Sequence, residues 1–209
     1  MLMQQALNYV FSNAEKGNPK SILQTIDNFV LESGQFLMNV GPEKGAILRE
    51  QLLKSKPNNV IELGTFIGYS AVLISSTIEE KSKLTSIDSD IQSVEIAKEL
   101  IKFAGLGNKV NLVHGSAEEI IPKLNFNADF VFIDHAKKKY LSDLKLLETE
   151  GIIHKNCTVF ADNVGIFKDE MVEYFNHVRN SGKYQSQNFS SKLEYRNNIY
   201  DEVEISIKN

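Results

Sequence analysis

Between residues 57 and 162 the sequence alternates short apolar runs with amphipathic stretches, and this alternation strongly constrains the fold. The apolar runs are typical of strands buried on both faces, whereas the stretches between them have helical spacing. Strands that alternate with helices form right-handed βαβ units, so the pattern predicts a parallel sheet. The expected strands are 59–63, 83–88, 109–114, 129–134 and 157–162, and the expected helices between them are 69–79, 91–104, 117–124 and 138–148.

The N-terminal segment, 1–56, lacks this alternation and predicts three added helices. The first covers 3–14, and Ser21 is expected to cap the second. Gly41-Pro42 opens the third, because proline suits the first turn of a helix.

The C-terminal segment has a third sequence pattern. After an amphipathic helix at 169–180, two strand-like stretches, 184–190 and 199–207, follow with no helix between them. They are therefore expected to pair antiparallel at one edge of the sheet. The fold class is then α/β, with a seven-stranded, mostly parallel sheet. We expect one domain over 1–209, with a core over 57–209.

Composition narrows the class of protein. The 209 residues are 42% hydrophobic and 24% charged, which is typical of a soluble globular domain. A net charge of −4 with mixed signs favours neither nucleic acid nor a membrane surface. The single cysteine, Cys157, excludes a disulfide framework and is expected to be a buried, inert thiol. With no signal-like N-terminus and no run of about 18 apolar residues, a cytoplasmic protein is expected.

Acidic and amide side chains stand where two of the expected strands end. Asp134 closes one apolar run, and Asp162 with Asn163 closes the next. In an open parallel sheet, ligands bind beyond the carboxyl ends of the strands. These residues offer only oxygen ligands, which suits a hard cation such as Mg²⁺ better than zinc.

A glycine-containing turn, 62–70, joins the first expected strand to the following helix. Gly64 and Gly68 do not form the dinucleotide fingerprint, so the turn alone is weak evidence for a nucleotide-type cofactor. Asp88 supports it, because an acid at the end of the next strand can accept hydrogen bonds from ribose hydroxyls. Glu62 ends a buried strand and needs a partner, which a cationic ligand would supply. The structural alternative is that Glu62 binds loop amides and Asp88 caps a helix.

Five motifs occur together: Met38-Asn39-Val40-Gly41, the 62–70 turn, Ile133-Asp134-His135-Ala136-Lys137, Ala161-Asp162-Asn163 and Leu193-Glu194-Tyr195. With this set, the sequence resembles the catechol O-methyltransferases, which are Mg²⁺-dependent S-adenosylmethionine enzymes. The resemblance covers nearly the whole chain. It implies the Rossmann-like class I methyltransferase fold and a small-molecule catechol or related phenol as acceptor.

The resemblance also implies roles for individual residues. The implied metal ligands are Asp134, Asp162 and Asn163, and the implied proton acceptor is Lys137. Glu194 would bind the catechol hydroxyl that is not methylated, with Phe36 and Met38 beside the acceptor. The implied cofactor contacts are Val40, Glu62, Gly64, Ser70, Asp88, Ser116, Glu118 and Asp134.

The sequence departs from the family at the acceptor and adenine positions. Mammalian members place tryptophans beside the catechol, whereas Phe36 and Ala136 stand here, and Phe167 replaces a proline. Ala117 and Glu118 replace a serine and a glutamine expected at the adenine. The first three departures bear on the choice of substrate, and the last two on cofactor affinity.

The chemistry requires a base, because a phenol with a pKa near 10 is mostly neutral at pH 7. Lys137 could take this proton, since a nearby dication favours a neutral amine. Spacing alone leaves Lys137 open between a base and a solvated charge in the run 137–139. His135 is a less favoured alternative, expected to pack beside the cofactor.

Other functions share some of these features. The acceptor could be another vicinal-diol phenol, such as a caffeoyl-type ester or a natural-product intermediate. A nicotinamide-dependent oxidoreductase would share the acid on the second strand but lacks its glycine fingerprint here. A non-catalytic cofactor-binding module would not need the metal ligands, Lys137 and Glu194 together.

Overall fold

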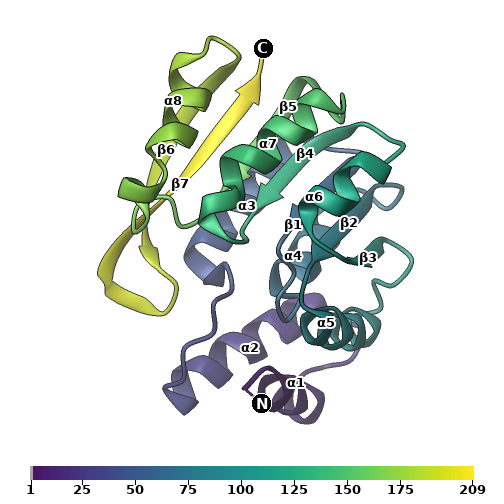
Figure 1. Ribbon diagram of the computed structural model, residues 1–209. Helices are drawn as coiled ribbons and strands as arrows, with labels where there is room; N and C mark the ends of the chain where they lie inside the picture. The colour runs from purple at the N-terminus through teal and green to yellow at the C-terminus, as the bar shows by residue number, and fades with distance from the viewer. Residues whose placement is uncertain (1) are drawn as a thin grey trace.

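The computed structural model describes residues 2–209. Seven strands form a mixed sheet in the order β3-β2-β1-β4-β5-β7-β6 (Figure 1). The strands are β1 (Asn59–Leu63), β2 (Lys83–Asp88), β3 (Val110–His114), β4 (Ala128–Ile133), β5 (Ile153–Ala161), β6 (Tyr184–Leu193) and β7 (Arg196–Lys208).

The pairing of the strands confirms the predicted fold class. Neighbours among β1 to β5 run parallel, and β7 pairs antiparallel with both β5 and β6. Three strands are longer than the sequence indicated. β5 begins at Ile153 rather than 157, β6 ends at Leu193 rather than 190, and β7 begins at Arg196 rather than 199. Their added residues are mostly polar and exposed, so they did not form part of an apolar run.

Eight α-helices are described within residues 2–209. They are α1 (Leu2–Asn13), α2 (Pro19–Ser33), α3 (Gly41–Ser55), α4 (Tyr69–Thr77), α5 (Ile91–Phe103), α6 (Ala117–Ile120), α7 (Tyr140–Thr149) and α8 (Val172–Asn180). Short 3₁₀ turns cover Ile121–Lys123, Lys137–Lys139 and Lys168–Glu170. The helix expected over 117–124 therefore becomes a 3₁₀ turn at Ile121, where Pro122 has no backbone N–H for the helical ladder.

The expected cap at Ser21 is wrong. α2 begins at Pro19, and the preceding Asn18 is the N-cap. Its side-chain oxygen accepts a hydrogen bond from the backbone N–H of Ser21 at 3.2 Å. Proline at the first helical position leaves no donor unsatisfied there, so the helix starts three residues earlier than a cap at Ser21 would indicate.

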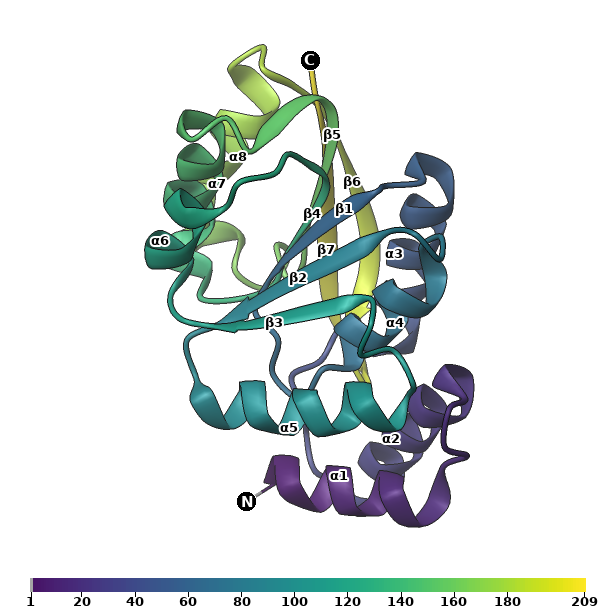
Figure 2. The same cartoon turned by 90° about the vertical axis from the view of Figure 1, so that its right-hand side faces the viewer.

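Alternate residues of each central strand pack into two separate cores. In β1, Val60 belongs to the core under α1 to α5, and Ile61 belongs to the core under α7 and α8. Figure 2 shows α3 and α4 on one side of the sheet, and α6, α7 and α8 on the other. A central sheet covered on both faces explains why its strands read as continuous apolar runs.

The order of the strands places a switch point between β1 and β4. From β1 the chain moves outward to β2 and β3, and then returns to β4 and moves outward on the other side to β5. The carboxyl ends of β1 and β4 therefore face one crevice, where ligands bind in folds of this kind. Over residues 2–209, none of the helices combines the length and apolar character needed to cross a bilayer.

Candidate active site

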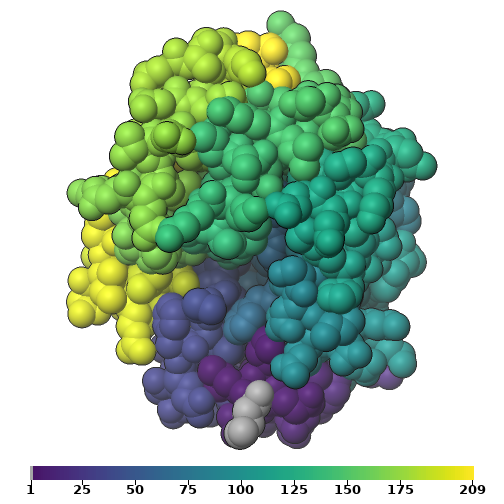
Figure 3. All heavy atoms as spheres, in the orientation of Figure 1, coloured from purple at the N-terminus to yellow at the C-terminus, as the bar shows by residue number. Residues whose placement is uncertain are grey.

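A cavity of about 860 Å³ opens at this switch point. Figure 3 shows a recess between the purple N-terminal segment and the green segment above it. The predicted site residues on the cavity wall are Phe36, Met38, Gly64, Ser70, Asp88, Ser116, Glu118, Asp134, Lys137, Asn163 and Glu194. Three other predicted residues, Val40, Glu62 and Asp162, are fully buried behind the wall.

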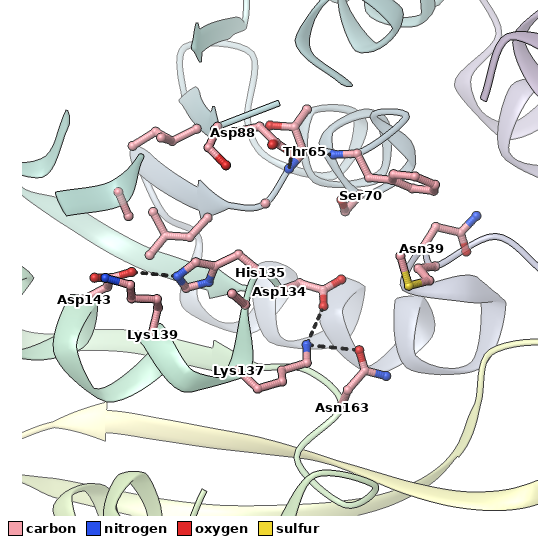
Figure 4. Close-up of a pocket in the computed structure, with 18 of the residues that line it drawn as sticks. Asn39, Thr65, Ser70, Asp88, Asp134, His135, Lys137, Lys139, Asp143 and Asn163 are labelled. Carbon is pink, nitrogen blue, oxygen red and sulfur yellow. Dashed lines mark hydrogen bonds and ion pairs between the residues drawn. The ribbon is translucent and has the colours of Figure 1, made fainter. Parts of the chain in front are cut away.

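Asp88 organises the turn after β1. One of its carboxylate oxygens accepts hydrogen bonds from the backbone N–H groups of Thr65 and Phe66, at 2.9 and 3.0 Å. Phe66 has a φ of 49°, a left-handed conformation that is costly for a bulky residue. The other oxygen accepts from the backbone N–H of Asp90, which in turn caps α5. Asp88 thus binds the loop amides itself, and it still faces the cavity (Figure 4).

Gly64 brings the same turn against β4. Its φ is 98°, and a Cβ atom there would collide with the backbone oxygen of Asp134. Only glycine permits this approach between the ends of the two central strands. The close contact sets the cofactor turn beside Asp134.

Glu62 lies fully buried beneath this turn. Its Oε2 accepts a hydrogen bond from Ser86, whereas its Oε1 has no hydrogen-bond partner among residues 2–209. Burial raises the pKa of this carboxyl to about 8, against the opposing effect of hydrogen bonds from Ser70 and Ser86. Ser70 lies on the cavity wall, so Glu62 is one side chain removed from the cavity.

The far end of the cavity carries two polar pairs. Lys139 and Glu118 form an exposed ion pair with an Nζ–Oε2 distance of 2.6 Å. His135 Nε2 lies 2.7 Å from Asp143 Oδ2, and the imidazole stacks on the ring of Tyr140. Asp143 was not predicted, because no motif in the sequence marks it. The Nε2 atom of His135 is thus paired with Asp143, and its predicted role of packing beside the cofactor stays a prediction.

Lys137 marks the position where oxygen ligands converge. Its Nζ donates to Asp134 Oδ1 at 3.0 Å and to Asn163 Oδ1 at 3.3 Å (Figure 4). It also donates to the phenol oxygen of Tyr140 at 2.6 Å. Tyr140 is fully buried and was not predicted. An ammonium group thus stands between two of the three predicted metal ligands.

The third predicted ligand, Asp162, lies directly behind this position. Its Oδ1 contacts a lysine, but its buried Oδ2 has no hydrogen-bond partner in the structure. The next residue, Asn163, has a φ of 54°, a left-handed conformation that asparagine tolerates better than most residues. This turn at the end of β5 places Asn163 on the cavity wall with Asp134, while Asp162 stays buried behind it.

The lysine behind Asp162 is Lys44 of α3, which is fully buried. Its Nζ lies 2.8 Å from Asp162 Oδ1, 2.8 Å from Glu194 Oε2 and 3.0 Å from Asp201 Oδ2. Neither Lys44 nor Asp201 was predicted from the sequence. A signal existed for Lys44, because it stands four residues before Leu48 on the inward face of the helix.

The cluster carries an excess of negative charge. The four carboxylates are Asp134, Asp162, Glu194 and Asp201, and the two cations are Lys44 and Lys137, so the formal charge is −2. Burial raises the pKa of Asp162 to about 6, and it also raises the pKa values of Asp134 and Glu194 although Lys44 lowers both. These acids would be stabilised in their charged form by a further cation.

Within residues 2–209, no group of three or more His, Cys, Asp or Glu side chains has metal-binding geometry. The predicted ligand set is of a different kind, since it has only two carboxylates and is completed by the Asn163 amide. The observed donors fit a hard divalent cation: all are oxygens, one is an orphaned buried carboxylate oxygen, and an ammonium group stands among them.

The cavity wall includes the three departures from the resemblance that bear on the choice of substrate. Phe36, Ala136 and Phe167 all lie on the wall, and Ala136 is exposed. Arg196, at the start of β7, places its guanidinium 5.6 Å from the centre of the Phe36 ring. Lys137 Nζ lies 5.9 Å from the centre of the Phe167 ring. Both aromatic rings line the cavity, and that of Phe167 lies beside Lys137.

Comparison with known proteins identifies the family. The family model described as O-methyltransferase matches residues 13–197. Catechol O-methyltransferase B of Danio rerio is 38% identical over 197 residues, covering 92% of this chain and 74% of the relative. Catechol O-methyltransferase of Bos taurus is 34% identical, covering 92% and 71%. This chain belongs to the catechol-type O-methyltransferase family. It is an S-adenosylmethionine-dependent enzyme.

The fold agrees with that membership. The O-methyltransferase TomG from Streptomyces achromogenes, whose structure is a complex with S-adenosylmethionine, superposes with a TM-score of 0.78. The match covers 90% of this chain and 89% of TomG, at 17% sequence identity. At this identity the likeness concerns the fold, and it confirms the Rossmann-like architecture expected for this O-methyltransferase.

Proposed function

We propose that this O-methyltransferase moves the methyl group of S-adenosylmethionine to one hydroxyl of a catechol held by Mg²⁺, with Lys137 as the base. The observation that carries the proposal is the convergence of oxygen donors beside Lys137. Asp134 Oδ1 and Asn163 Oδ1 both contact the Lys137 ammonium, and the unpartnered Asp162 Oδ2 lies behind them.

Charge supports a divalent ion at this position. The formal charge of −2 on the surrounding cluster equals the charge that one divalent cation would neutralise. Asp134, Asp162 and Asn163 would hold the ion, and it would there stabilise the negative charge of a phenolate oxygen. The names of the two animal relatives support a catechol as the acceptor.

The residues around this position have separate tasks. Lys137 Nζ accepts the hydroxyl proton when the amine is neutral, and Tyr140 Oη holds that nitrogen at 2.6 Å. Glu194 faces the cavity and can accept a hydrogen bond from the second hydroxyl. The acceptor oxygen then forms a bond to the methyl carbon as the carbon–sulfur bond breaks. Alignment of these atoms supplies much of the acceleration.

The charge of the cofactor also points to where it binds in the cavity. We propose that the wall residues of the 62–70 turn and of the segment after β3 bind S-adenosylmethionine, whose sulfonium and ammonium groups are cations. Glu62, buried behind Ser70 with one unpartnered oxygen, would supply negative charge on that side. The proposed cofactor contacts are Val40, Glu62, Gly64, Ser70, Asp88, Ser116, Glu118 and Asp134.

A broader acceptor range is the second candidate. Exposed Ala136 on the wall leaves space where a tryptophan was expected, and this supports other vicinal-diol phenols as acceptors. A panel that contains simple catechols and larger caffeoyl-type esters distinguishes the two.

The cytoplasmic localisation stays a prediction of the sequence.

The test is methyl transfer from labelled S-adenosylmethionine to this panel, with Mg²⁺ and with EDTA. We expect turnover that requires Mg²⁺ or Mn²⁺, stops in EDTA, and returns when excess metal is added. Calorimetric binding of S-adenosylmethionine in EDTA serves as the control that the protein stays folded. Full turnover in the chelator would refute the metal mechanism.

A further inference from the structure

Asp201 is a fully buried carboxylate on β7 that the proposed reaction does not use. Its Oδ2 accepts hydrogen bonds from Lys44 Nζ and from Asn163 Nδ2, both at 3.0 Å. Its Oδ1 accepts from the backbone N–H groups of Gly165 and Ile166, both at 3.1 Å. Four donors thus occupy the four acceptor positions of one carboxylate.

These contacts determine which way the Asn163 amide points. Its Nδ2 faces Asp201 Oδ2 at 3.0 Å and Glu194 Oε2 at 3.4 Å, and both of these atoms are acceptors. Its Oδ1 faces the Lys137 ammonium at 3.3 Å. A flipped amide would bring oxygen against two carboxylates and an NH₂ group against a cation, so only one orientation is compatible.

Asp201 also fixes the turn that follows Asn163. The N–H groups of Gly165 and Ile166 point to its Oδ1, and a Cβ on Gly165 would lie 2.6 Å from the backbone nitrogen of Glu202. The turn therefore packs directly against β7. Ile166 and Phe167 continue from it onto the cavity wall.

Lys44 offsets the repulsion among the buried carboxylates around it. Asp162, Glu194 and Asp201 are all buried, and each lies within 3.0 Å of the same Nζ. Three carboxylates this close would repel one another strongly without a shared cation. Lys44 thus holds a ligand of the proposed metal, the proposed acceptor-binding acid and Asp201 in one cluster.

We propose that Asp201, supported by Lys44, is a positioning residue that presents the Asn163 carbonyl oxygen to the metal and fixes the acceptor wall. The inference rests on the proposed function, because it gives Asp201 a role in the same metal-dependent site. Outer partners of metal ligands commonly change metal affinity by about 10–100-fold when they are replaced.

The experiment compares Asp201→Asn with the wild type by Mn²⁺ binding, measured from the free-ion electron paramagnetic resonance signal in the presence of S-adenosylmethionine. We expect the Mn²⁺ dissociation constant to rise about 10–100-fold, while calorimetric cofactor affinity changes less than about twofold. The matched control is Asp129→Asn. Asp129 also accepts two backbone N–H groups, at 2.8 and 3.0 Å, but at the opposite end of the sheet.

A second comparison separates positioning from general stability. In an Asn163→Asp background, the introduced carboxylate and that of Asp201 would face each other as like charges at the observed 3.0 Å spacing. There, Asp201→Asn should raise the melting temperature and strengthen Mn²⁺ binding, because it restores a donor–acceptor pair. In the wild-type background it should do the opposite.

The outcomes are distinct. The positioning role would be overturned if Asp201→Asn left Mn²⁺ binding unchanged in the wild-type background. It would also be overturned if the effect of Asp201→Asn on Mn²⁺ binding had the same sign in both backgrounds. A wild type that binds no Mn²⁺ and turns over without metal would overturn the proposed function, and the inference with it.

Discussion

Glu62 offers a quantitative test of how the cofactor end of the cavity is built. The carboxyl is fully buried, one oxygen has no partner, and burial raises its pKa from 4.5 to about 8. In the free enzyme at pH 7 the group is therefore about 90% protonated. Glu62→Gln keeps the size of the side chain and removes the titration.

The expected stability change follows from linkage. Because the folded-state pKa lies above the unfolded value, the folded protein binds more protons between pH 4.5 and 8. Stability from this group is therefore lost as the pH rises through that window. Between pH 5 and pH 8 the loss is about 3–4 kcal/mol. For a chain of this size that corresponds to a fall in melting temperature of about 6–16 °C.

Cofactor binding should remove the proton from the Glu62 carboxyl group. S-adenosylmethionine is cationic near its sulfur and amino groups, so its binding favours the ionised carboxylate of Glu62. At pH 7 binding should then release up to about 0.9 proton. Titration calorimetry in buffers with different ionisation enthalpies measures this number directly. Glu62→Gln should release far less and should bind the cofactor more weakly.

Two comparisons between the variant and the wild type can refute this reasoning. The first is the melting temperature from pH 5 to pH 8, where the wild-type curve should fall relative to that of Glu62→Gln. The second is proton release at pH 7. Parallel melting curves together with equal proton release would show that Glu62 is ionised in the free enzyme, or that cofactor binding does not change its protonation.

Three further predictions concern the acceptor end. Lys137→Ala should lower kcat by about 10²–10⁴-fold while calorimetric cofactor affinity changes little; near-normal kcat would return the role of base to His135. Ala136→Trp should narrow the range of accepted catechols and sharpen the meta:para ratio, because Ala136 leaves the cavity wall open; an unchanged ratio on an asymmetric catechol would show that this wall does not orient the acceptor. Lys44→Met should lower the free energy of unfolding at pH 7 by about 3–5 kcal/mol, since it leaves three buried carboxylates without their cation. Urea denaturation measures that loss, with Lys81→Met as the control for an exposed pair; equal losses in the two variants would contradict it.

The sheet was predictable because its central strands are buried on both faces. β1 and β2 have the predicted bounds, and four consecutive residues of each are buried, 60–63 and 84–87. β5 was predicted too short, because its first half carries His154, Lys155 and Asn156, which are exposed. A strand with a polar, solvent-facing end gives no apolar run from which to predict its start.

The oxygens of the proposed metal ligands could be brought together from sequence, because parallel neighbours end at one edge. β4 and β5 pair in register from Phe130 with Thr158 to Ile133 with Ala161, which places Asp134 beside Asp162. Lys44 and Asp201 could not be found that way. They are 157 positions apart, and their contact depends on how α3 and β7 pack around β5.

The two ends of the cavity therefore depend on different ranges of the chain. The cofactor turn is fixed by Asp88, which binds amides only 22 and 23 positions away within the β1 to β2 unit. The acceptor end is fixed by Lys44 and Asp201, from α3 and β7, around the end of β5. A perturbation of the long-range cluster leaves the local turn intact, because the two networks share no hydrogen bond among the contacts described. Variants at Lys44 or Asp201 that still fold should thus lose metal and acceptor affinity while they keep S-adenosylmethionine, and variants at Asp88 should do the reverse.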